Sequence, residues 1–114
     1  MDTEQLIRIL DSPAVAREWF QTLALNDLRQ AYDALTAIAE SGMTLDLVAI
    51  TATQLEQALP QVAKPDQALS YLARFISLSR SPIALGSLWE RDQAALLTLL
   101  VMFSTSIPLA ELLM

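Results

Sequence analysis

The residues of this chain that come nearest to a reactive site are Gly86-Ser87 and, shortly after them, Glu90-Arg91-Asp92. Enzymes that transfer nucleotidyl groups use a Gly-Gly or Gly-Ser turn to orient phosphates, and two alternate acids on a strand, about ten residues later, hold Mg²⁺. Here the acids follow after only two intervening residues in a helical context, and Glu111 is the one acid further along. We therefore assign no active site to this stretch. Gly86 instead predicts the close approach of a neighbouring helix, and Trp89 predicts a packing anchor.

The other side chains exclude most enzyme mechanisms. The chain has no histidine and no cysteine, so neither a Ser–His–Asp nor a Cys–His system can form, nor a zinc site of the usual kind. No glycine-rich phosphate loop followed by lysine occurs. The carboxylates are scattered at predicted helix starts or opposite apolar stripes, where solvation and the helix N-termini account for them. They include Asp11, Glu18, Asp27, Asp33, Glu40, Asp46, Glu56 and Asp66. The sequence thus predicts no catalytic, cofactor-binding or metal-binding residue.

The composition leaves two interpretations of the apolar residues open. They make up 54 % of the 114 residues, against 18 % charged, so the chain is more apolar than a typical soluble domain. Either the core is unusually large for the size of the chain, or some apolar surface belongs against a partner.

The charge bears on the partners that can be expected. The net charge is −6, and a polyanion is repelled by such a field, so we expect no nucleic acid. The seven bases form no run. Arg74, Arg80 and Arg91 could share a face that binds a phosphate or an acidic partner, although solvated arginines on exposed helix faces are the favoured interpretation. The absence of cysteine fits a reducing cytoplasm.

One stretch is long enough to test for a membrane span. Residues 93–110 carry no charge over eighteen positions. Ser104, Thr105, Ser106 and Pro108 interrupt the stretch and would strand polar groups in lipid. The N-terminus, with Asp2 and Glu4, has no apolar core like that of a signal peptide. We therefore expect no membrane association, and we expect a buried helix, a break and a second short helix starting at Ser106.

Every periodic signal along the chain is helical. The sequence predicts an all-α fold, a compact bundle or array of about six to eight short helices with no sheet. We expect one domain over residues 1–114, or an N-terminal segment of a larger protein, with soft boundaries near 42–44 and 60–65. Helix starts are predicted at Thr3, Ser12-Pro13, Asn26 or Asp27, Thr44, Lys64-Pro65-Asp66, Ser81-Pro82 and Asp92. Gly42 is expected in a left-handed conformation after the third helix.

The apolar spacing predicts which faces are buried. In the second helix the face comprises Val15, Trp19 and Phe20. In the fourth helix a narrow stripe recurs at three- and four-residue steps, leaving Thr51 and Gln54 among the polar residues on the other faces. That stripe consists of Leu45, Val48, Ala52, Leu55 and Leu59. The helix from Leu96 to Phe103 is apolar all round, which predicts burial on every side.

The C-terminal half resembles a known family. Leu72, Arg74 and Phe75 form an L-x-R-F pattern, and an apolar helix further on runs into FSTSIPLAELL. The corresponding residues there are Leu99, Phe103, Ser104, Ser106, Leu109, Ala110, Leu112 and Leu113. Over roughly residues 65–114 the chain is similar to the N-terminal region of glutamine synthetase adenylyltransferase, whereas residues 1–64 agree only in being helical. The chain departs from the family at Pro108, where an aromatic residue is common before the leucine, and it ends where a family member continues.

The resemblance implies a parent protein with two nucleotidyltransferase-type domains. Such proteins attach AMP to a tyrosine of glutamine synthetase and remove it, under the control of the PII protein. The parent would use ATP and Mg²⁺, but its acidic motifs lie beyond this region, so no catalytic residue is carried over. The partners implied are the protein's own C-terminal catalytic domain and glutamine synthetase or PII.

Two functional hypotheses follow. The first is a non-catalytic N-terminal helical segment of such an adenylyltransferase, in a nucleotidyltransferase parent. The alternative is a free-standing α-helical protein-interaction module that could form a homodimer through its apolar C-terminal helix. An autonomous enzyme is the least favoured hypothesis. The candidate partner contacts are Arg80, Arg91, Leu109, Leu112, Leu113 and Met114.

Overall fold

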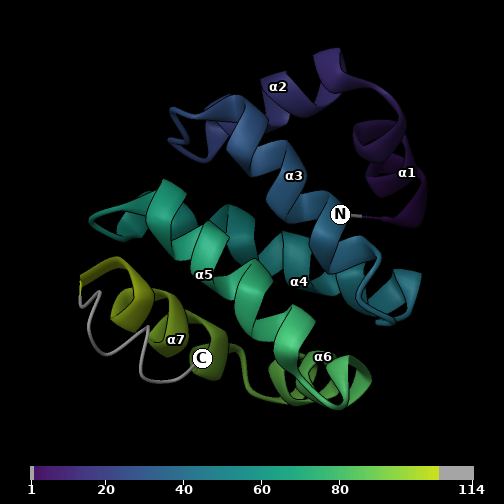
Figure 1. The fold of residues 1–114 in the computed structure, drawn as a ribbon, viewed down its shortest axis with the longest axis vertical. Helices are drawn as coiled ribbons and strands as arrows, with labels where there is room; N and C mark the ends of the chain where they lie inside the picture. Colours follow the sequence, from purple (N-terminus) through teal and green to yellow (C-terminus); the bar gives the residue numbers. More distant parts are fainter. Residues whose placement is uncertain (1, 106–114) are drawn as a thin grey trace.

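The computed structural model describes residues 2–105, which form seven α-helices, one short 3-10 helix and no strand (Figure 1). This architecture confirms the predicted all-α, multi-helix fold. The elements are α1 (Thr3–Asp11), α2 (Pro13–Thr22), α3 (Leu28–Ala39), α4 (Leu45–Ala58), the 3-10 helix η1 (Leu59–Gln61), α5 (Pro65–Leu78), α6 (Pro82–Arg91) and α7 (Gln93–Thr105).

The predicted capping residues set the helix starts. A side-chain oxygen accepts the free N–H three residues on in five of these helices, which offsets the missing intrahelical partners of the first turn. The pairs are Asp2 with Gln5, Ser12 with Val15, Asp27 with Gln30, Thr44 with Leu47, and Ser81 with Ala84. Of the two predicted caps for α3, Asp27 is therefore the one used. After α3, Gly42 has a φ of +105°, which confirms its left-handed conformation.

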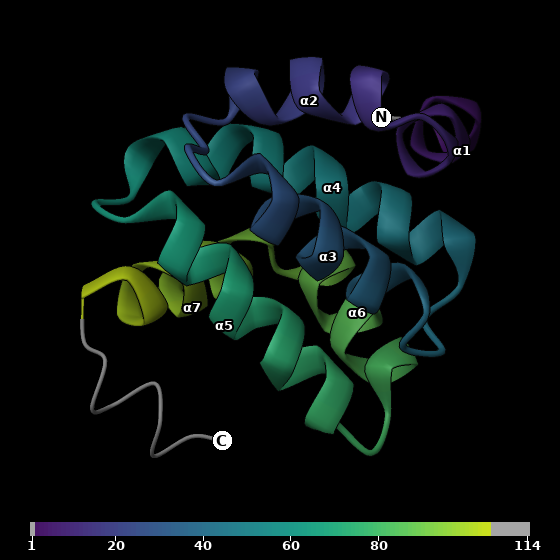
Figure 2. The same cartoon turned by 45° about the horizontal axis from the view of Figure 1, so that its top comes forward.

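Helix α4 lies in the middle of the bundle. It contacts α1, α3, α6 and α7, and Figure 2 shows α1 and α2 on one side of it and α6 and α7 on the other. Of the predicted stripe, Val48, Ala52, Leu55 and Leu59 are buried, but Leu45 is 40 % exposed. The buried surface is also wider than predicted, because Thr51 and Gln54 are buried. A helix that neighbours cover from several sides buries more than one stripe. Its buried residues are Leu47, Val48, Ala49, Thr51, Ala52, Gln54, Leu55 and Ala58.

The two buried polar side chains of α4 are tied to backbone oxygens. The Thr51 hydroxyl donates to the Leu47 carbonyl at 2.9 Å, within its own helix. Gln54 Nε2 donates to the Trp89 carbonyl at 2.7 Å, near the end of α6. On α5, Gln67 Nε2 likewise donates to the Phe103 carbonyl of α7 at 2.8 Å. The last four carbonyls of a helix have no intrahelical partner, so each glutamine satisfies one of them in a neighbouring helix.

Helix α7 is buried on one side only, so the prediction of burial all round is wrong. Leu96, Leu100 and Phe103 are fully buried, whereas Val101 is 43 % exposed. The helix packs against α4, α5 and α6, and Val101 lies away from the core. The Phe103 ring lies 6.0 Å from Tyr71 and 5.9 Å from Phe75, measured between centroids.

The predicted face of α2 needs one correction as well. Ala16 and Phe20 are buried and Trp19 is half-buried, but Val15 is exposed. Ala16 and Phe20 face the core. Val15 precedes Ala16 by one position, so its side chain points about 100° away from that of Ala16 around the helix axis.

Helix α6 approaches α4 closely at Gly86, as predicted. A Cβ atom at this position would lie 3.1 Å from Leu47 Cβ and 3.2 Å from Met43 Sδ. Trp89, three residues on, is fully buried and confirms its predicted role as a packing anchor.

The buried apolar residues form one cluster that runs from Leu6 in α1 to Phe103 in α7. The predicted soft boundaries fall at the turn before α4 and at the connection that precedes α5; as domain boundaries they stay predictions. In residues 2–105 no helix is both long and apolar enough to cross a bilayer. The short helix predicted from Ser106 lies outside the described residues.

Replacing Leu100 with aspartate should unfold the chain. The side chain is fully buried in α7, and an unpaired carboxylate there costs several kcal/mol against a total stability of about 5–15 kcal/mol. Thermal unfolding followed by circular dichroism measures the effect. The control is Val101→Asp, the exposed neighbour on the same helix, which should keep a cooperative transition. A cooperative melt of Leu100→Asp near the wild-type temperature would contradict the buried position of α7.

Gly86→Val should also lower stability, by about 1–3 kcal/mol, because the added side chain overpacks the contact between α6 and α4. The control is Ala84→Val, an exposed position on the same helix, which carries only the smaller helix-propensity cost. Urea unfolding compares the two variants. Valine has a higher helix propensity than glycine, so unchanged stability of Gly86→Val would contradict the close approach to Leu47.

Candidate functional site

The structure describes two of the six predicted partner contacts. Arg80 precedes α6 and Arg91 ends it, and both are exposed. Arg91 Nε donates to the Ser87 carbonyl at 3.4 Å, so this guanidinium lies back along its own helix. Leu109, Leu112, Leu113 and Met114 lie outside the described residues.

Between these arginines the outer side of α6 carries three exposed apolar side chains. At 100° per residue Ile83, Ala84 and Leu88 fall within an arc of about 140°, which also includes Ser87 and Arg91. Ile83, Ala84 and Leu88 are exposed, whereas Gly86 and Trp89 on the opposite side are buried. We refer to Ile83, Ala84 and Leu88 as the α6 face. Leu78, at the end of α5, is a further large exposed apolar side chain close in sequence. Figure 1 shows α6 at the edge of the molecule.

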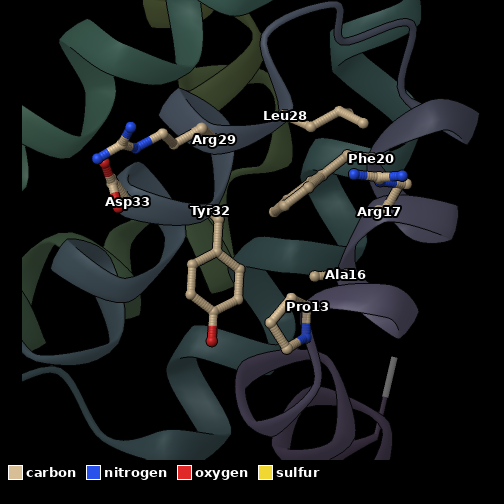
Figure 3. A pocket seen from close by; sticks show the side chains of 8 residues that line it. All are labelled: Pro13, Ala16, Arg17, Phe20, Leu28, Arg29, Tyr32 and Asp33. Carbon is tan, nitrogen blue, oxygen red and sulfur yellow. The ribbon is translucent and has the colours of Figure 1, made fainter.

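A groove of about 250 Å³ lies between α2 and α3 (Figure 3). Its apolar lining comes from Pro13, Ala16, Phe20, Leu28 and Tyr32, with Arg17, Arg29 and Asp33 beside it. The Tyr32 hydroxyl donates to the Leu10 carbonyl, and in Figure 3 the Arg29 side chain runs toward Asp33. The polar groups of this groove therefore do not converge on a common point, and we assign it no chemistry.

A second groove, of about 430 Å³, is formed by three helices, α1, α2 and α4. We call it the Trp19 groove. It is lined by Gln5, Arg8, Ile9, Val15, Glu18, Trp19, Thr22 and Glu56. Trp19 Nε1 donates to Glu56 Oε1 at 3.0 Å, and the Thr22 hydroxyl donates to the Trp19 carbonyl at 2.6 Å. The first bond ties the indole to α4, and the second lies within α2.

Sequence reasoning missed the Trp19 groove. The sequence predicts that Trp19 belongs to an apolar helix face and that Glu56 is a solvated carboxylate. The two residues are 37 positions apart, and only the packing of α2 on α4 brings them together. No local pattern in the sequence carries that signal.

The Gly86-Ser87 stretch is helical and does not form a turn. Both residues lie inside α6, and Gly86 is packed against Leu47, so no phosphate-orienting turn is formed there. Over residues 2–105 no group of three or more acidic side chains is arranged to hold a metal ion.

Of the described residues behind the family resemblance, Leu72, Phe103 and Ser104 are buried, Phe75 and Leu99 are partly buried, and Arg74 is exposed and not in the core. The Phe75 ring packs on the Phe103 ring. The Ser104 hydroxyl is buried and donates to the Val101 carbonyl at 3.0 Å. The L-x-R-F helix, α5, and the apolar helix, α7, are thus direct neighbours.

Comparison with known proteins finds no relative. No family model, no characterised protein and no solved structure matches this chain.

Removing the acceptor of the Trp19 indole should loosen α2 on α4. Glu56→Ala deletes the hydrogen bond and should cost about 0.5–1.5 kcal/mol of unfolding free energy, near the lower end because the bond lies at the surface. Glu56→Gln keeps an acceptor oxygen and is the matched control. Solvent exchange of the Trp19 indole proton, followed by NMR, should accelerate in Glu56→Ala only. The same exchange rate in both variants would mean that other contacts hold the indole.

Proposed function

We propose that this chain is a non-catalytic helical segment that works by packing against another protein surface, and that its parent is an adenylyltransferase acting on glutamine synthetase. The first half of this proposal is supported by the exposed α6 face. The second half rests on the resemblance over residues 65–114. The parent's reaction would be the transfer of AMP to and from a glutamine synthetase tyrosine, in the cytoplasm, with ATP and Mg²⁺ bound outside this segment.

The single observation that carries the docking role is that α6 exposes apolar side chains on its outer side. Its inner side holds Gly86 and Trp89 in the core, while Ile83 and Leu88 stand in solvent. Large apolar side chains grouped on an outer helix are typical of surfaces that meet another protein. Arg80 and Arg91 flank the group and can pair with acidic residues at the rim of such a contact.

The resemblance agrees with the packing of the described residues. Residues of its two parts, Phe75 and Phe103, lie in ring contact between α5 and α7. This contact lies inside the bundle. The first partner we propose is the catalytic domain of the parent protein, with glutamine synthetase or PII as further partners.

One observation favours the alternative of a homodimer. Val101 exposes a large apolar side chain on α7, the helix expected to form the dimer contact. Sedimentation of the chain at several concentrations distinguishes the two proposals, because a stable dimer would favour a free-standing module.

Leu88→Lys tests the docking role, with Ile7→Lys as its control. The two side chains are similarly exposed, 42 % and 44 %, but only Leu88 lies on the α6 face. Both variants of residues 1–114 should unfold within about 0.5 kcal/mol of the wild type, as surface changes usually do. In the protein encoded by the whole reading frame, Leu88→Lys should lower AMP transfer to glutamine synthetase or the melting temperature, and Ile7→Lys should not.

Two results would contradict this proposal. A reading frame without a Gly-Gly or Gly-Ser motif followed by two alternate acids would remove the adenylyltransferase parent. Equal behaviour of Leu88→Lys and Ile7→Lys in the whole protein would remove the docking role of α6.

A further inference from the structure

The Trp19 groove has the dimensions and the composition of a binding site. Its volume of about 430 Å³ lies in the range of small ligand pockets, about 300–1,000 Å³. Ile9 provides a buried apolar floor, and Val15 and Trp19 provide apolar walls. The polar groups come from three helices and therefore converge on one volume from different directions.

The indole is held in place before any ligand arrives. Its N–H donates to Glu56 Oε1 at 3.0 Å, so the ring cannot rotate without losing this bond. The Trp19 ring also lies 5.5 Å from the Phe20 ring, between centroids, and Phe20 is fully buried. A fixed aromatic wall lowers the entropy cost of binding, because the side chain has little freedom left to lose.

The charges of the groove favour a cation. Glu18 and Glu56 contribute two carboxylates and Arg8 one guanidinium, so the lining is negative on balance. The net charge of −6 of the whole chain adds to this field. A carboxylate has about four acceptor positions, so Glu56 can accept a further donor besides the indole.

We propose that the Trp19 groove binds an arginine side chain of a partner protein. A planar guanidinium can stack on the indole face and at the same time donate to the carboxylates of Glu18 and Glu56. The methylene stem of the arginine would cover Val15 and Ile9. This inference is independent of the proposed function, because it involves α1, α2 and α4 and no residue of the α6 face.

Other occupants fit the groove less well. An acidic side chain would be repelled by two carboxylates and attracted by Arg8 alone. A purely apolar side chain would desolvate the carboxylates of Glu18 and Glu56 without donating a hydrogen bond to them, which costs binding free energy. A lysine would satisfy the charge, but its ammonium group lacks the plane that stacks on an aromatic ring.

A pair of short peptides tests the inference on the whole chain. The probe is acetyl-Gly-Arg-Gly-amide, and its control is acetyl-Gly-citrulline-Gly-amide, which has nearly the same shape without the charge. The arginine peptide should shift the Trp19 indole N–H resonance in NMR spectra at low salt, with weaker binding as salt rises. The citrulline peptide should bind at least several-fold more weakly. Trp89, which is buried, serves as the internal reference.

Three variants locate the binding site. Glu18→Gln should weaken binding of the arginine peptide by about two- to five-fold, as expected for one exposed ion pair, and Arg8→Gln should strengthen it by a similar factor. Glu90→Gln, on α6, removes the same charge from a position outside the groove and should change nothing. The inference is wrong if the arginine peptide leaves the Trp19 resonance unmoved, if both peptides bind equally, or if Glu90→Gln weakens binding as much as Glu18→Gln.

Discussion

The burial of α4 is the constraint on which the rest of this bundle depends. Helices α1, α3, α6 and α7 pack against it and Trp19 of α2 donates a hydrogen bond to Glu56 on it, so its surface must suit several neighbours at once. Small residues allow this, because Ala49, Ala52 and Ala58 let the packed helices come near. Gly86 has the same effect on α6, because the absence of a side chain there lets α6 lie close to Leu47 of α4. Thr51 and Gln54 each donate to a backbone carbonyl, which offsets part of the cost of their burial. Gln54 Oε1 is buried and has no hydrogen-bond partner among the described residues.

The local features of this fold could be predicted from the sequence, and the burial of individual faces could be predicted only in part. Ser12-Pro13, Thr44 and Ser81-Pro82 mark helix starts because capping needs only neighbouring residues. The errors fall where tertiary neighbours decide. Gln54 looks like a surface residue until α6 is placed beside it, and Leu45 and Val101 match an apolar pattern although no described helix covers them.

The two candidate surfaces, the α6 face with its arginines and the Trp19 groove, differ in how far the sequence alone could predict them. Arg80 and Arg91 could be named from the sequence as bases that could share a face. The exposed apolar arc between them could not, because helical spacing alone does not say which side of α6 faces the core. The Trp19 groove could not be named, because Arg8, Trp19 and Glu56 come from three helices. A site assembled across helices leaves no periodic trace in the chain.

The glutamine side chains of α4 and α5 have a consequence for how the bundle loosens. Helix ends normally fray one by one, at little cost and without disturbing the remainder. Here the Trp89 and Phe103 carbonyls, near the ends of α6 and α7, are held by donors from other helices. Opening either end therefore breaks a contact between helices, so these two termini should melt together with the interior.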